Sequence, residues 1–441
     1  MKSAGRGVLP RARPPSQGPI DPVLMQTTAK PAPLTTADGT PLKTALLRAQ
    51  RRAKIKAFLL VFPLLAFVLL SFIVPIFQML ERSAYNDMFS HNAPALAQWF
   101  AENPKGSEIT EEAYAALVAD LKVMNEAKTS GEAGMRINYT FPGTVSLFKA
   151  GGREAAKMEA PYKEKMIALN PMWGDARLWA SLRSASSAWT KDFFMVSADL
   201  KRSADGGFER AEPEQRIYVY IYIKTFVFSA VITVICLLMA FPVAHLLATL
   251  PASKANLLMI LVLLPFWTSL LVRTSAWIAL LQQQGVINDG LVATGIIDNE
   301  NRIAMIYNQT GTIVVMTHIL LPFMVLPLYS VMRVIPPSYA RAARSLGASS
   351  WTTFRRIYLP QTLPGIAAGS LLVFILAVGY YITPALVGGA DGQLISNFIA
   401  FHMSKSNWSM AAALAAFLLV AVLILYWLYD RLIGIDRLKL G

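Results

Sequence analysis

The sequence predicts an all-α integral membrane protein with six transmembrane helices and a large insert between the first and the second. Its 441 residues are 54% hydrophobic, more than an ordinary soluble domain contains. A bilayer core about 30 Å thick needs about 20 apolar residues in a helix, and six runs are long enough. These runs are residues 57–80, 225–249, 255–281, 311–333, 363–388 and 408–430.

The N-terminal region precedes the first apolar run. Residues 1–56 contain eleven Lys or Arg and two acidic residues, and their first part is rich in Pro, Ser and Thr. We therefore expect a disordered, basic cytoplasmic tail. The run 57–80 begins too late and is too long for a cleavable signal peptide, so it is predicted to be the first transmembrane helix.

The distribution of charge predicts the orientation. The connection 333–356 contains five Arg and no acidic residue, whereas segment 81–216 contains seventeen basic and nineteen acidic residues. The positive-inside rule places both termini and the first of these segments in the cytoplasm, and the second on the opposite side. The net charge of +14 is then a sign of membrane orientation, and a nucleic-acid partner is not expected.

Segment 81–216 is predicted to be a helical periplasmic insert. It is polar, and about 135 residues are enough for an independent domain of modest stability. Trp173, Trp179 and Trp189 are expected to supply part of a small core. The segment resembles no family that we recognise.

Residues 336–360 lie between two apolar runs and read PPSYARAARSLGASSWTTFRRIYLP. We expect Ser338 to cap a short helix and Gly347 to end it in a left-handed conformation. A second short helix is expected from Ser349 or Ser350 to Pro360. The apolar face of the first helix is predicted to contain Tyr339, Ala342, Ala343 and Leu346. That of the second helix is predicted to contain Trp351, Phe354 and Ile357.

The spacing in this segment resembles the EAA loop of ABC importer permeases. The family pattern is E-A-A, three residues, Gly, nine residues and I-x-L-P, and only its Glu is replaced here, by Arg341. In that family the loop docks on the ATP-hydrolysing subunit. The resemblance implies that the coupling residues are Arg341, Ala342, Ala343, Gly347, Ile357, Leu359 and Pro360, and that the chain itself hydrolyses nothing.

Further motifs resemble the spermidine/putrescine branch of these permeases. They are P-F-W-T and R-T-x-A-W around Arg273, and T-P-A-L-V-G-G at 383–389. The resemblance covers about residues 217–435, a permease core with five transmembrane helices. The resemblance also implies six candidate residues for the translocation path, which are Arg273, Trp277, Tyr380, Tyr381, Thr383 and Pro384.

Each of these candidates has a structural alternative. Arg273 can snorkel or pair with neighbouring groups, and Tyr380 and Tyr381 can belong to an aromatic belt. Many polyamine permeases carry an acidic residue where these tyrosines stand, and no acidic residue lies inside any of the six runs. Polyamine selectivity is therefore expected to come from a binding protein or a partner permease.

Signatures of enzymes are absent from the sequence. It contains no P-loop, no H-E-x-x-H and no G-x-S-x-G pattern, and its four histidines are scattered. His245 and His318 lie in apolar runs, where interhelical hydrogen bonds are as plausible as a functional role. We expect no catalytic residue, no metal site and no cofactor.

The resemblance implies one membrane-spanning half of an ABC importer in the bacterial inner membrane. Its partners would be cytoplasmic ATPase subunits, a second permease in a heterodimer, and a periplasmic solute-binding protein. The solute would be a polyamine such as spermidine or putrescine; an opine, an amino-acid derivative or iron is the alternative. An ATP-independent carrier or channel would need charged residues in the spans or paired broken helices, and neither is evident.

Overall fold

The computed structural model describes residues 41–433. The expected tail therefore lies outside the described residues up to position 40, and so does the end of the expected permease core at 434–435. The chain divides into two units after Pro75. The first unit contains helix α1 (Leu42–Val68) and a π-helical turn η1 (Leu69–Ile73), and helix α2 (Val74–Ala84) begins there.

The expectation of disorder is wrong for residues 42–56, which belong to α1. This stretch contains no Gly or Pro and is rich in Ala, Leu, Arg, Lys and Gln, the residues with the highest helix propensity. The helix continues through the predicted first span, and residues Leu46–Ala84 form a candidate membrane span of 39 residues.

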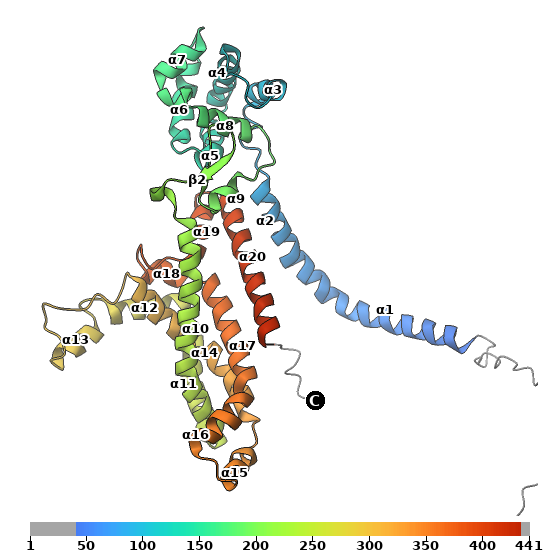
Figure 1. Cartoon of the computed structure of the whole chain (residues 1–441), viewed down its shortest axis with the longest axis vertical. Coiled ribbons are helices and arrows are strands. Elements are labelled where there is room, and N and C mark those ends of the chain that lie inside the picture. Colours follow the sequence, from blue (N-terminus) through green and yellow to red (C-terminus); the bar gives the residue numbers. More distant parts are fainter. Residues whose placement is uncertain (1–40, 434–441) are drawn as a thin grey trace, which may run out of the picture. The chain divides into compact units, whose positions relative to one another are not determined.

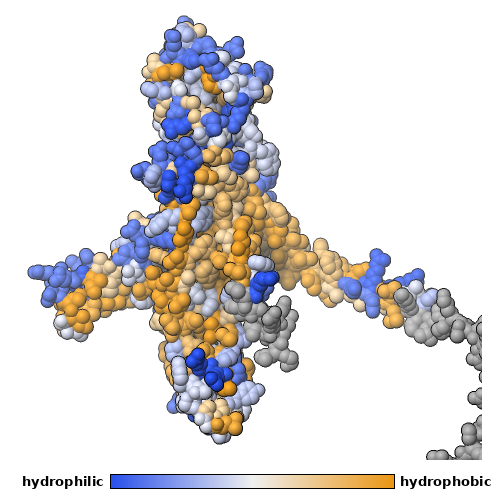
Figure 2. Space-filling view, in the orientation of Figure 1, coloured by the Kyte–Doolittle hydropathy of each residue, from blue (hydrophilic) through white to orange (hydrophobic). Residues whose placement is uncertain are grey.

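Three long helices form the centre of the second unit. Helices α10 (Tyr218–Thr249), α14 (Gln309–Arg333) and α17 (Leu359–Gly379) pack against one another (Figure 1). Small residues allow close approach: a Cβ atom on Gly365 would lie 3.1 Å from the Pro327 carbonyl oxygen. Hydrophobic side chains cover these helices and α20 (Trp408–Ile433) on the face seen in Figure 2.

The third predicted span, 255–281, is not one helix. Helix α11 (Ala252–Leu263) and the short η4 (Leu264–Trp267) are followed by α12 (Leu270–Leu281), and the path bends by 98° between them. Thr268 is extended, and the Ser269 hydroxyl accepts a hydrogen bond from the Val272 amide, which starts a new helix. With α13 (Val286–Ala293), the described residues contain five candidate spans, or six if this bent pair is one span.

The boundaries of the fifth predicted span, 363–388, are also wrong. The helical path runs without a break through α16 (Ser350–Thr353), η5 (Phe354–Tyr358) and α17, and ends at Gly379. Pro360 therefore does not end a helix. The preceding π-helical turn, in which the Leu359 amide bonds to the Phe354 carbonyl, accommodates the missing N–H of this proline. Residues 382–387 form a separate helix, α18 (Ile382–Val387).

The insert is a small helical domain. Its helices are α3 (Pro94–Glu102), α4 (Glu111–Glu126), α5 (Ser130–Asn138), α6 (Thr144–Ala155), α7 (Tyr162–Leu169), α8 (Ala176–Ala185) and α9 (Asp192–Ser197), with 3₁₀ turns at Pro171–Gly174 and Pro213–Gln215. Strands β1 (Leu200–Arg202) and β2 (Phe208–Arg210) pair antiparallel, with Lys201 opposite Glu209. The prediction of a helical fold is thus confirmed.

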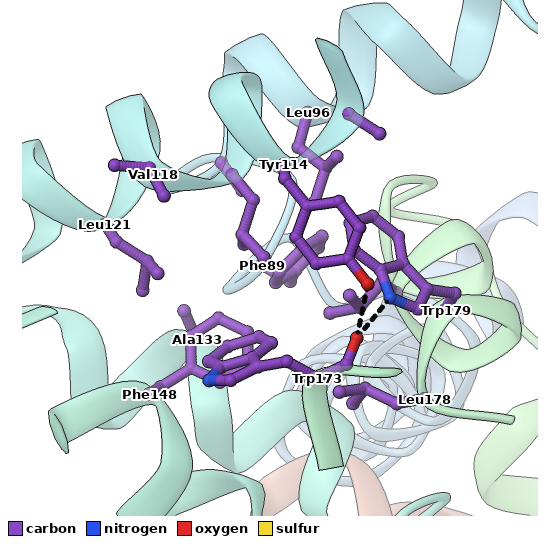
Figure 3. Close-up of a cluster of buried hydrophobic side chains, with 14 of the residues drawn as sticks. Phe89, Leu96, Tyr114, Val118, Leu121, Ala133, Phe148, Trp173, Leu178 and Trp179 are labelled. Carbon is purple, nitrogen blue, oxygen red and sulfur yellow. Dashed lines mark hydrogen bonds between the residues drawn. The ribbon is translucent and has the colours of Figure 1, made fainter. Parts of the chain in front are cut away.

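Aromatic and aliphatic residues together form the core of the insert (Figure 3). Trp173 is fully buried, and its carbonyl oxygen accepts hydrogen bonds from the Tyr114 hydroxyl at 2.8 Å and from Trp179 Nε1 at 2.7 Å. Trp189, which we expected in this core, is 63% exposed, so that expectation is wrong. It lies in the short connection between α8 and α9, next to Tyr85 at the end of α2.

A buried ionic cluster joins α5, α9 and β1. The Asp192 carboxylate accepts a hydrogen bond from Arg136 at 3.1 Å and another from Arg202, and the side chains of Arg136 and Asp192 are each 1% exposed. Burial alone would raise the pKa of Asp192, but the two arginines and the Ser184 hydroxyl together lower it. The carboxylate is therefore charged at neutral pH and balances two arginines, of which Arg136 is buried and Arg202 partly buried.

Candidate coupling loop and transport path

The loop between α14 and α17 forms a compact knob. Helix α15 (Pro337–Ser345) is followed by its C-cap Leu346 and by Gly347, whose φ of +87° confirms the predicted left-handed conformation. The Ala348 amide donates to the Ala343 carbonyl at 3.0 Å and the Gly347 amide to the Arg344 carbonyl at 2.9 Å, the hydrogen bonds of a Schellman motif. The chain thereby reverses its direction within a few residues.

The ends of the two short helices were only partly predicted. Ser349 caps α16 as expected, with its hydroxyl accepting a hydrogen bond from the Thr352 amide. Ser338, in contrast, is not the N-cap: α15 begins at Pro337, and Pro336 occupies the capping position. A proline in the first helical position needs no amide partner and already has a helical φ, so the helix starts two residues earlier than predicted.

The apolar residues of the knob are exposed. The exposed fractions are 89% for Leu346, 68% for Trp351 and 52% for Tyr339. The loop's arginines are exposed beside them: Arg341, Arg344, Arg355 and Arg356. An exposed cluster of large apolar side chains with a basic rim is typical of a surface that another protein covers.

The knob is anchored to the end of α10 by contacts that the sequence did not reveal. The Tyr358 hydroxyl lies 2.8 Å from Nδ1 of His245, and the Phe354 ring packs edge-on against Phe241. The interhelical hydrogen bond considered for His245 is thus present. Its partner could not be found from the sequence because the two residues are 113 positions apart.

Arg273 closes the break between η4 and α12. Its guanidinium group donates to the Pro265 carbonyl and, at 3.1 Å, to the Thr268 carbonyl. Carbonyl groups at a helix end within a membrane need such partners because lipid offers none. Of the two predicted roles, structural pairing is the one that these contacts support.

The other candidates gather where α12, α14 and α18 meet. Nε1 of Trp277 donates to Nδ1 of His318 on α14 at 3.0 Å, and Trp277 and Tyr380 pack against the same buried apolar cluster. Thr383 and Pro384 are buried, and the Thr383 hydroxyl has no hydrogen-bond partner among the described residues. Tyr381 is 47% exposed.

A buried lysine on α10 escaped the sequence analysis because it directly precedes an apolar run. Lys224 on α10 is only 9% exposed, and its ammonium group lies 5.9 Å from the centre of the Tyr220 ring and 5.7 Å from that of Phe228. Both distances allow cation–π attraction. Among the described residues, no group of His, Cys, Asp and Glu side chains could hold a metal ion.

Comparison with known proteins identifies the family. Residues 214–433 match the family of binding-protein-dependent transport system inner membrane components. The spermidine/putrescine transport system permease PotB of Escherichia coli is 36% identical over 222 residues, which are 49% of this chain and 80% of the relative. The chain belongs to this family. It is therefore a multi-pass inner-membrane permease subunit of an ABC importer, and not an enzyme.

Other relatives match a similar share of this chain. PotB of Salmonella typhimurium is also 36% identical, over 49% of this chain and 77% of the relative. The inner membrane ABC transporter permease YdcU of Escherichia coli is 31% identical, over 49% of this chain and 73% of the relative. The chain was also compared in structure with a solved bacterial ABC transporter involved in the import of alginate. The match covers 67% of this chain and all of the solved chain, with 16% identity and a TM-score of 0.47.

Proposed function

We propose that this permease is one membrane-spanning half of a polyamine importer. The observation that carries the proposal is its 36% identity to spermidine/putrescine permeases over about four fifths of their length. The proposed complex contains a second permease, cytoplasmic ATPase subunits and a periplasmic binding protein that delivers the solute. Both termini and the knob then lie in the cytoplasm, and the insert lies in the periplasm.

The knob is proposed to be the surface on which an ATPase subunit docks. Exposed Leu346 and Trp351 would enter an apolar groove of the ATPase, and the rigid Gly347 turn would fix the angle between the helices on either side. Because η5 continues into α17 without a break, a displacement of the knob would be transmitted directly to a membrane helix. Closure of the ATPases would thus drive alternating access.

ATP dependence of uptake tests this proposal against an ATP-independent carrier or channel. The complex would be reconstituted in liposomes with labelled spermidine and its binding protein, with ATP or a non-hydrolysable analogue on the ATPase side. We expect uptake with ATP and no uptake with the analogue. Uptake that proceeds equally with the analogue would contradict the assignment of the knob as a coupling element.

A second candidate solute class is favoured by the charges of the described helices. Lys224 on α10 is a buried cation, and the described apolar runs offer no interior carboxylate to a dication. An opine or amino-acid derivative carries a carboxylate that could pair with Lys224. Competition of such compounds with spermidine for the binding protein would distinguish the two classes.

Arg341 provides a test of the docking surface. It is exposed and replaces the Glu of the family pattern, so the proposal requires an acidic residue opposite it on the ATPase. We expect Arg341→Glu to weaken assembly and a matching reversal on the ATPase to restore it, with a coupling energy of about 0.5–3 kcal/mol in a double-mutant cycle. Arg355→Glu makes the same change of two charge units elsewhere on the knob, and the reversal on the ATPase that restores Arg341→Glu should not restore it. If the effects of Arg341→Glu and of the ATPase reversal on the free energy of assembly were strictly additive, Arg341 would be exposed to solvent only and would have no partner on the ATPase.

The insert is proposed to help receive the binding protein. It is an independently packed helical domain of the permease, and loops of this length without a role are uncommon. Replacing residues 90–186 with a short flexible linker should leave membrane insertion and ATPase binding intact. The binding-protein concentration for half-maximal ATPase stimulation should rise. An unchanged concentration with continued uptake would show that the insert is a passive shield.

A further inference from the structure

The insert exposes a pair of aromatic rings near its junction with the membrane helices. Of its four tryptophans, all within the described residues, Trp99, Trp173 and Trp179 are at most 7% exposed, whereas Trp189 is 63% exposed. Its ring packs edge-on against Tyr85, with the ring centres 5.4 Å apart. The domain core therefore does not account for the position of Trp189.

Backbone and side-chain contacts fix this pair at the end of two membrane helices. The Asn86 amide donates to the Ala188 carbonyl at 2.8 Å, and the Asn86 side chain donates to the Ser409 hydroxyl at 2.8 Å. One candidate span ends at Ala84, and another begins at Trp408. Trp189 thus lies beside the ends of two candidate membrane spans.

Trp408 completes the arrangement. Its side chain is 48% exposed, and the Arg82 guanidinium lies 5.9 Å from the centre of its ring. Tryptophan and tyrosine rings are enriched at membrane interfaces, where an apolar ring and a polar N–H or O–H are both satisfied. We propose that Tyr85, Trp189 and Trp408 form an aromatic edge through which the insert rests among the phospholipid headgroups.

The insert is held at this height by its junction with α10. Both carboxylate oxygens of Asp199 accept hydrogen bonds from the first turn of this helix, from the amides of Tyr218 at 3.0 Å and Val219 at 2.9 Å. Phe193 of α9 is buried in the same apolar cluster as Met410 of α20. These contacts oppose a movement that would lift the aromatic edge away from the membrane.

Charge around the aromatic edge is nearly balanced. Three exposed cations, Arg82, Lys191 and Lys405, stand there against two exposed anions, Glu81 and Asp87. The contact with lipid therefore depends on the rings and not on attraction to anionic headgroups. It should be equally strong in bilayers of phosphatidylcholine and in bilayers that contain phosphatidylglycerol.

Spin-label accessibility tests the proposal in the assembled importer in nanodiscs. The native Cys236 is buried and is the chain's single cysteine, so an added exposed cysteine can be labelled selectively when the partner subunits lack cysteine. One label is placed at Ser187→Cys, two residues from Trp189. The matched control is Val123→Cys on α4, which is 62% exposed on a part of the insert away from α20 (Figure 1).

Oxygen concentrates in the bilayer, and a water-soluble nickel complex is excluded from it. We expect the label at 187 to collide more with oxygen and less with nickel than the label at 123, in both lipid compositions. Adding Trp189→Ala should move the 187 label toward the values of the control, and Trp189→Phe should not. Equal values at the two sites, or protection from both reagents by a covering protein, would overturn the proposal.

Discussion

Replacing Gly347 with valine is expected to abolish transport while the helices still insert into the membrane. A Cβ atom at this position would meet no atom within 4 Å, so space is not the reason. The reason is the φ of +87°, which costs an L-residue about 1–2 kcal/mol and a β-branched residue more. That cost lowers the population of the bent knob about 5- to 30-fold or more.

Asparagine provides the matched control because it tolerates the left-handed conformation better than other non-glycine residues. Uptake and ATPase activity should be largely retained in Gly347→Asn. In Gly347→Val, the ATPase should bind weakly or hydrolyse ATP without uptake. Normal uptake by the valine variant at normal expression would contradict the assignment of the knob as the coupling loop.

Replacing Asp192 with alanine is expected to unfold the insert. It would leave buried Arg136 and partly buried Arg202 without their counter-charge, and removing one partner of a buried ion pair such as Arg136–Asp192 typically costs about 3–5 kcal/mol. That cost is a large fraction of the total stability of a domain, which is about 5–15 kcal/mol. Limited proteolysis of the solubilised permease should then show rapid cleavage within residues 90–186.

Asp205→Ala is the control because this side chain is exposed on the connection between β1 and β2. It removes the same charge without leaving a buried cation, so its cleavage pattern should match the wild type. The lowered pKa of Asp192 also predicts the pH dependence: its stabilising effect is present above the usual aspartate pKa and is lost on acidification. Equal protease resistance of the two variants would show that the ionic cluster does not stabilise the insert.

Much of the membrane region was predictable because apolar runs and basic connections are local properties of the sequence. The left-handed Gly347 and the Ser349 cap were also predictable, since each depends on a few neighbouring residues. Breaks within the runs were not. The bend near Thr268 and the π-helical turn before Pro360 depend on backbone hydrogen bonds that hydropathy does not report.

Contacts between distant segments account for the other differences. Arg273 is a charged residue within an apolar stretch of sequence. Only the position of the Pro265 carbonyl in the structure shows what its guanidinium group binds. The His245–Tyr358 hydrogen bond and the Asp192 cluster likewise join residues on different elements. Trp189 could not be told apart from core tryptophans, because composition does not reveal on which side of a domain a residue lies.

ATPase stimulation by the loaded binding protein tests the central claim most directly. The complex of this permease, its partner permease and the ATPases would be reconstituted and exposed to the binding protein with spermidine, putrescine, an opine, an amino-acid derivative or iron. We predict that hydrolysis rises with a polyamine, and that it loses this response in Gly347→Val. Stimulation by another solute but not by spermidine or putrescine would contradict the polyamine assignment, and a full response in the valine variant would contradict coupling through the knob.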